Sequence, residues 1–299
     1  MRLAFFGSSG DMALLPLEAV AERHEVVAVV RADGRRAGWR RSPGAIARAL
    51  GLLRRDPLAA WAHRRGIPCV SASRRDDPRL LARLSRLQPD LFLVSAFRFI
   101  LGRQLLALPR LGALNLHASL LPRHRGPVPW FWVYHCDDRE TGVTVHWMTD
   151  RVDAGDIVGQ AAAALERGLS VDSLGERCAR QGAGLLAAAV ASVEAGTAAR
   201  RVQDEANATP APCVAPGSSM VDFSAWGAER VWHFLTGLYP RHREPLFDNA
   251  GRAIRYGGVR GFELTTEGQR PVGRVTPDAR GLALHCRDGL VWLDAGTAG

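Results

Sequence analysis

The sequence predicts an α/β protein with a doubly wound, mostly parallel β-sheet and a second, smaller domain built from short strands. Three observations predict this class. Short apolar runs alternate with helical patterns through residues 1–205, as in sheets built from βαβ units. Residues 26–30 are continuously apolar, which is typical of a parallel strand buried on both faces. After a proline-rich segment, residues 221–299 alternate short apolar runs with glycine and aspartate turns.

The larger domain is expected over residues 1–205, and its elements follow the order that such a sheet requires. The first strand, residues 3–6, leads into Gly7-Ser-Ser-Gly10. This run lacks the middle glycine of a dinucleotide-binding loop and indicates a tight turn instead. A proline at the first position supports a helix at Pro78–Leu87. The other expected elements are helices at 14–23, 58–65 and 171–195, and strands at 26–30, 67–70, 91–95, 113–117 and 142–148.

A linker is expected over residues 206–220, because Pro210, Pro212, Pro216 and Gly217 interrupt regular structure there. The smaller domain is expected to follow over residues 221–299. It should begin with a helix at 225–235 and continue with strands at 253–259, 272–276, 282–286 and 290–293.

The composition indicates a soluble globular protein. Of the 299 residues, 47% are hydrophobic, which is ordinary for a chain with a packed core. Charged residues interrupt every apolar run before it reaches bilayer length, and no signal peptide precedes the first strand. We therefore expect no membrane association and a cytoplasmic location.

The cysteines and histidines do not predict a metal site or a disulfide framework. The five cysteines are scattered along the chain without a Cys-x-x-Cys pair. His124, His135 and His146 lack the spacing of metal ligands, so we interpret them as structural or surface residues. We expect no bound metal.

The charge is strongly basic. The net charge is +9, and all the basic residues that contribute to it are arginine. A basic surface attracts phosphate-bearing or otherwise polyanionic partners. Eight arginines lie within residues 31–55; this segment is either a contact for nucleic acid or phosphate, or a solvated loop.

Three polar residues stand where a sheet of this kind places its site. Asn115 and His117 are two positions apart on the expected strand Ala113–His117, so their side chains share one face. Asp153 follows the next strand in a tight loop with Gly155. Sites in open α/β sheets lie beyond the carboxyl ends of the strands. A carboxylate beside an imidazole orients the ring and favours its protonated form.

This trio suits acyl transfer. Asn115 offers an N–H donor to a developing oxyanion, His117 can donate to the same oxygen or move protons, and Asp153 can orient His117. The chain has no serine or cysteine in a Gly-x-Ser-x-Gly elbow, which favours direct attack by an amine. Taken singly, each of the three residues has an ordinary structural explanation as a turn or hydrogen-bonding residue.

Five short motifs, in order and at their spacings, resemble the signature of the 10-formyltetrahydrofolate-dependent formyltransferases. They are Asn115-Leu-His117, Ser119-Leu-Leu-Pro122, Arg125-Gly126, Thr141-Gly-Val-Thr144 and Asp153-Ala-Gly-Asp156. The resemblance implies a Rossmann-like catalytic domain with Asn115, His117 and Asp153 as its catalytic residues. Residues around Asp222 and Tyr239 resemble the start of a small C-terminal OB-like β-barrel that the methionyl-tRNA formyltransferases carry.

The resemblance also implies a binding site for the folate cosubstrate. Phe97 and Phe99 could line an apolar slot for the flat ring, or could belong to ordinary core packing. Relatives that act on tRNA often have Tyr-Gly where this chain has Phe97-Arg98. The residues expected at the folate site are Phe97, Phe99, Ile100, Ser119, Leu120, Leu121, Pro122 and Asp150.

The activity implied is transfer of a formyl group from 10-formyltetrahydrofolate to a primary amine. The acceptor is either initiator methionyl-tRNA or a small amine such as an amino sugar or a biosynthetic intermediate. The aromatic segment 130–134 either packs as a helix beside the site or forms a wall for the acceptor. Two other classes fit the sequence less well: an RNA-binding module without chemistry, which the intact trio disfavours, and an NAD-linked dehydrogenase, which the missing glycine disfavours. The sequence predicts no oligomeric state.

Overall fold

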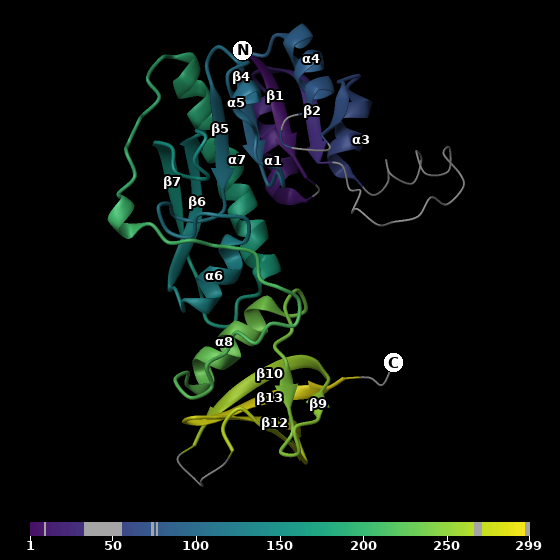
Figure 1. Ribbon diagram of the computed structural model, residues 1–299, viewed down its shortest axis with the longest axis vertical. Coiled ribbons are helices and arrows are strands. Elements are labelled where there is room, and N and C mark those ends of the chain that lie inside the picture. Colours follow the sequence, from purple (N-terminus) through teal and green to yellow (C-terminus); the bar gives the residue numbers. More distant parts are fainter. Residues whose placement is uncertain (9, 33–55, 73–74, 76, 266–270, 297–299) are drawn as a thin grey trace, which may run out of the picture. The chain divides into compact units, whose positions relative to one another are not determined.

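The computed structural model describes residues 1–8, 10–32, 56–72, 75, 77–265 and 271–296 (Figure 1). Most of the arginine-rich segment 31–55 lies outside these residues. The chain divides by its contacts into two compact units. The first contains residues 1–127, 142–163 and 175–210, and the second contains residues 128–141, 164–174 and 211–299. The domain boundaries expected at residues 205 and 220 remain a prediction.

The first unit is built on a seven-stranded sheet with the order β3-β2-β1-β4-β5-β6-β7. Strands β1 to β5 pair in parallel, and β6 runs antiparallel to β5. The predicted mostly parallel sheet is therefore confirmed. The strands are β1 (Arg2–Gly7), β2 (Glu25–Ala32), β3 (Cys69–Ala72), β4 (Leu91–Ser95), β5 (Ala113–His117), β6 (Glu140–Trp147) and β7 (Ile157–Ala164).

Helices follow the strands of this sheet and bury their apolar sides against it. They are α1 (Asp11–Ala21), α3 (Pro57–Arg64), α4 (Pro78–Leu87), α5 (Arg103–Leu106) and α7 (Val171–Glu194). Leu80 and Leu84 of α4 share one core cluster with Phe6 of β1 and Phe92 of β4. Asp56 and Asp77 cap α3 and α4 by accepting backbone N–H groups of the first turn. Figure 1 shows α7 alongside β5 and β6.

The second unit contains a small antiparallel sheet with the order β10-β13-β12-β11. A short hairpin joins it through an isolated bridge between Phe247 and Arg274, which gives the barrel-like region that the sequence predicted. Its elements are α6 (Pro129–His135), α8 (Ala228–Leu238), β8 (Leu246–Phe247), β9 (Ala253–Ile254), β10 (Tyr256–Leu264), β11 (Val275–Asp278), β12 (Gly281–Cys286) and β13 (Gly289–Ala295).

The aromatic segment forms helix α6 and packs inside the second unit. The Phe131 ring lies 5.6 Å from Phe234 of α8 and 5.1 Å from His242 between ring centroids. Trp132 Nε1 donates to the carbonyl of Pro212, and the Tyr134 hydroxyl donates to Leu169. These contacts favour the packed helix over the acceptor wall.

No helix in the described part of the chain combines the length and apolar character needed to cross a bilayer.

Candidate active site

Two neighbouring strands and one loop position the predicted trio. In the antiparallel pair of β5 and β6, Asn115 lies opposite His146, and His117 lies opposite Thr144. Because alternate residues of a strand share a face, these four side chains belong to the same side of the sheet. Asp153 comes from the loop between β6 and β7 and adopts a left-handed backbone conformation with φ of 50°, which is uncommon outside glycine.

The structure brings the three predicted groups together. Nδ1 of His117 lies 3.5 Å from Oδ2 of Asp153. The Asn115 amide donates to Oδ1 of Asp153 over 3.3 Å. The backbone N–H of Gly126 donates to Oδ2 of Asp153 over 2.9 Å. One carboxylate therefore links the amide and the imidazole.

His146 is a fourth member of the cluster, which the sequence analysis interpreted as structural or surface. Its Nε2 lies 3.0 Å from the Asn115 amide nitrogen and 3.5 Å from Oδ1 of Asp153. Its Nδ1 donates to the carbonyl of Trp147 over 2.9 Å, so a neutral ring accepts at Nε2. The two amide hydrogens of Asn115 are thus directed at His146 and Asp153. The sequence offered one signal for this role: His146 lies two positions after Thr144 on the same expected strand, so the two side chains share a face.

The electrostatics of the site favour a neutral ring beside an ionised carboxylate. His117 is buried, with its Nε2 donating to the carbonyl of His124 over 2.9 Å. Burial lowers the pKa of His117 below its ordinary value, and Asp153 only partly opposes this shift. Burial alone would raise the pKa of Asp153, but that pKa lies below its usual value, and the Gly126 N–H that donates to the carboxylate lowers it whatever the charge of the two rings. Burial therefore outweighs the expected preference for a protonated His117.

The turn at residues 119–122 acts as a scaffold in this structure. Ser119 Oγ donates to the carbonyl of Arg123, and Thr144 Oγ1 donates to the carbonyl of Ser119. The Leu121 N–H donates to Thr144 Oγ1 over 3.1 Å. These bonds tie the turn that follows β5 to β6. Leu120 and Pro122 are half-buried in the same turn.

The other residues expected at the folate site have different partners. Phe97 and Phe99 are half-buried against the core of the sheet, with 5.5 Å between the rings of Phe97 and Phe6. Core packing thus accounts for the buried part of both rings. Ile100 is 49% exposed. Asp150 pairs with Arg103 of α5.

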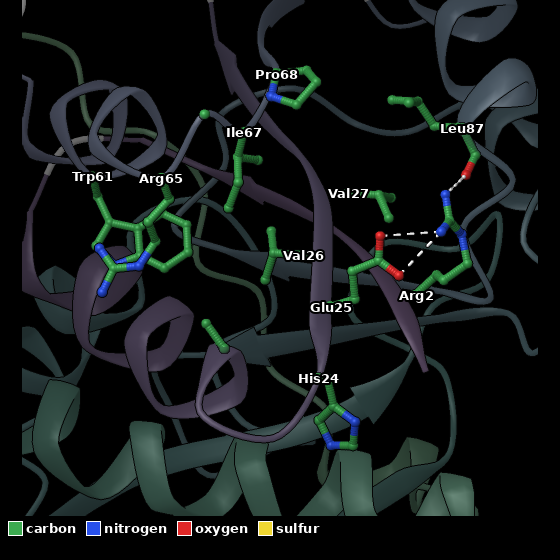
Figure 2. A pocket seen from close by; sticks show the side chains of 12 residues that line it. Arg2, His24, Glu25, Val26, Val27, Trp61, Arg65, Ile67, Pro68 and Leu87 are labelled. Atoms are coloured by element: carbon green, nitrogen blue, oxygen red, sulfur yellow. Dashed lines mark hydrogen bonds and ion pairs between the residues drawn. The ribbon is translucent and has the colours of Figure 1, made fainter.

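Among the cavities in the described part of the first unit are the following two. The larger, of about 460 Å³, is lined by the start of β2 and the end of α3. Figure 2 shows Arg2 bound to Glu25 on one side and Arg65 over the Trp61 ring on the other. It contains no member of the trio. The second, of about 400 Å³, is lined by Asp150, Ala154, Gly155 and other residues of the Asp153 loop and of α5. Its size is that of a small-molecule site.

Comparison with known proteins identifies the family. Residues 1–190, which include the whole trio, match the family described as formyl transferase. The chain belongs to the formyl transferase family. The family resemblance expected from the motifs is therefore confirmed, and the protein is an enzyme of one-carbon group transfer.

The formyl transferase has similar relatives among curated proteins. A methionyl-tRNA formyltransferase of Moorella thermoacetica is 37% identical over 241 residues, 80% of this chain and 74% of the relative. A methionyl-tRNA formyltransferase of Anaeromyxobacter dehalogenans is 33% identical over 297 residues, 98% of this chain and 90% of the relative. The second of these similarities extends along nearly the whole length of this formyl transferase.

Solved structures share the fold of this formyl transferase. A sugar 3N-formyl transferase, WlaRD, determined with dTDP and 5-N-formyl-THF, covers 99% of this chain and 97% of its own with a TM-score of 0.69 and 13% identity. An N-formyltransferase from Helicobacter canadensis, in complex with folinic acid and dTDP-3-aminofucose, gives the same TM-score and identity and covers 99% of both chains. At this identity the likeness concerns the fold alone.

Proposed function

We propose that this formyl transferase moves the formyl group of 10-formyltetrahydrofolate to the amine of methionyl-tRNA. The observation that carries the chemistry is the convergence of Asn115, His117 and Asp153 on one carboxylate-centred cluster. The acceptor is supported by the curated relatives, which are named methionyl-tRNA formyltransferase and reach 98% coverage of this chain.

The first step forms the bond between the amine nitrogen and the formyl carbon. As the amine attacks, the carbonyl electrons move to oxygen, and this oxyanion needs a hydrogen-bond donor. The Asn115 amide supplies the donor. Its longer bond, 3.3 Å to Asp153, is the one that the incoming oxygen would replace.

The second step breaks the bond between the formyl carbon and N10 of the folate. The proton that leaves the amine passes to the neutral ring of His117 and then to N10, the leaving nitrogen. Nδ1 is the ring nitrogen that faces Asp153 over 3.5 Å, because Nε2 is engaged by the carbonyl of His124. The carboxylate of Asp153 stabilises the imidazolium that forms between the two transfers.

We infer that the folate binds beside the Asp153 loop, where the 400 Å³ cavity lies, although Asn115, His117 and Asp153 are not among the residues that line this cavity. Asp150 and Met148 line this cavity, which supports Asp150 as a contact of the cosubstrate. Phe97, Phe99, Ile100 and the turn at residues 119–122 remain predicted contacts.

An acceptor panel tests the proposal. The purified protein is given 10-formyltetrahydrofolate with charged initiator tRNA, and in parallel with amino sugars and nucleotide-linked amino sugars. We expect N-formylmethionine after deacylation of the tRNA. Formylation of small amines alone would contradict the tRNA acceptor, and failure with every amine would contradict the proposed function.

A further inference from the structure

Residues 201–210, called the strap below, run beside both loops that carry the candidate site. Arg201 pairs with Ile157 at the start of β7. Further along, the carbonyl of Thr209 accepts the backbone N–H of Arg125 over 2.8 Å. The Thr209 hydroxyl accepts a hydrogen bond from the backbone N–H of His124. The carbonyl of His124 in turn accepts a hydrogen bond from Nε2 of His117. The strap is therefore linked to His117 through one intervening residue, His124.

Gln203 links the strap to the Asp153 side. Its Nε2 donates to the carbonyl of Asp153 over 2.9 Å and to the carbonyl of Gly155 over 2.7 Å. Only 5% of the residue is exposed. The buried amide donates both of its hydrogens to carbonyls of one loop and so fixes the path of that loop. If the loop moved, each carbonyl would lose its hydrogen-bond donor in a place where water cannot replace it.

The carbonyl oxygen of the same Gln203 amide also accepts two hydrogen bonds. Oε1 of Gln203 accepts from Nη2 of Arg125 over 2.8 Å and from Nε over 3.1 Å. Arg125 is itself paired with Glu205 of the strap. The chain of contacts thus runs from Glu205 through Arg125 and Gln203 to the backbone of Asp153.

Asp153 needs such support because of its backbone. The left-handed backbone conformation is unfavourable for residues that carry a Cβ. Asp153 adopts this conformation, with φ of 50°. The two Gln203 bonds, together with the Gly126 N–H on the carboxylate, oppose relaxation of the loop. Relaxation would move the carboxylate away from the His117 ring.

We propose that Gln203 is a positioning residue for formyl transfer, which holds the Asp153 loop so that its carboxylate faces His117. The inference rests on the proposed function of the trio. Glutamine is required because the two loop carbonyls need N–H donors, and a glutamate of the same shape has none at that end.

The test compares Gln203→Met and Gln203→Glu with the wild-type protein. We expect kcat to fall on the order of 10- to 100-fold in both variants, as for a small misplacement of a reacting group. KM for either substrate should stay within about threefold of wild type, since Gln203 is not expected to touch substrate. The matched control is Gln181→Met on α7, whose amide donates to the carbonyl of Ala162, and it should keep wild-type kcat.

A double variant of Gln203 and Asp153 distinguishes a positioning role of Gln203 from a general loss of structure. In an Asp153→Asn background, Gln203→Met should lower kcat by less than about twofold more, because both changes act on the same carboxylate. Multiplicative losses in the double variant would overturn the inference. So would a Gln203→Met protein with wild-type kcat, or one whose loss matches its unfolded fraction in thermal denaturation.

The wild-type assay keeps the two proposals apart. A wild-type protein that formylates some amine, with Gln203 variants that match it, overturns only the positioning role. A wild-type protein that formylates no amine overturns the proposed function and the positioning role together.

Discussion

His146 shows where reasoning from single residues ends. Period-two alternation put Asn115 and His117 on one face, and the loop motif supplied Asp153. His146 joins them only because β6 runs antiparallel to β5 and sets it opposite Asn115. The pattern of one strand does not disclose the direction or register of its neighbour. Contacts between strands were therefore the part of the site that the sequence could not predict.

His233, another buried histidine, should lower the free energy of unfolding as the pH becomes acidic. His233 of α8 is fully buried, and burial lowers its pKa to about 4. The unfolded chain, with an ordinary pKa of about 6.5, takes up the proton first. The contribution of His233 to stability is thus complete above pH 6.5 and is lost as the pH falls toward 4. The loss should reach about 3 kcal/mol.

The control for this prediction is His233→Asn. Nδ1 of His233 accepts the N–H of Gly168 over 3.0 Å, and an asparagine carbonyl can accept the same bond without titrating in this range. Urea unfolding at several pH values between 4 and 7 measures the effect. Equal pH dependence in the variant and the wild type would contradict the assignment.

At the scale of elements, local signals predicted the ends of some helices and strands well. Helix α4 and strands β4 and β5 have the predicted bounds, because a capping aspartate, a proline and apolar strand patterns mark them. Strand β7 was missed, since its glycine, glutamine and alanines (Ile157–Ala164) carry little strand preference. This segment is a strand because it forms hydrogen bonds with the neighbouring strand β6. The expected strand at 253–259 is divided into β9 and the start of β10.

The Asp153 loop predicts a sharp contrast between two glycines. A Cβ at Gly155 would lie 1.9 Å from the carbonyl oxygen of Trp147, so Gly155→Ala must displace the loop. We expect it to cost about 1–3 kcal/mol of stability and to lower kcat. A Cβ at Gly184 of α7 meets nothing within 4 Å, and Gly184→Ala should stabilise the helix by up to about 1 kcal/mol.

Thermal unfolding and formyl transfer assays of both alanine variants check this contrast. If Gly155→Ala were as stable and as active as Gly184→Ala, the loop would not be held in the geometry described.

For the whole molecule, alternation of strands and helices was enough to predict the fold class. The path of the strap was not predictable, because Gln203 and Arg125 are 78 positions apart and no local pattern pairs them. The helix expected over the aromatic segment is α6, but its packing partner α8 was not predictable from the local pattern.

The overall charge leads to a prediction about salt. A chain with a net charge of +9 that binds tRNA through several phosphates should lose affinity steeply as the salt concentration rises. The KM for charged initiator tRNA should therefore increase several-fold between about 50 and 200 mM salt. The KM for the folate, measured in parallel, should change much less. A flat response for the tRNA would point to a small acceptor.

The most direct measurement is the turnover of Asn115→Ala and His117→Ala in formyl transfer, beside Gly184→Ala as a folded reference. Removing an oxyanion donor or the proton carrier should lower kcat on the order of a hundredfold or more, while circular dichroism and thermal unfolding show a folded protein. Near-normal turnover in either folded variant would contradict the assignment of formyl transfer to this cluster.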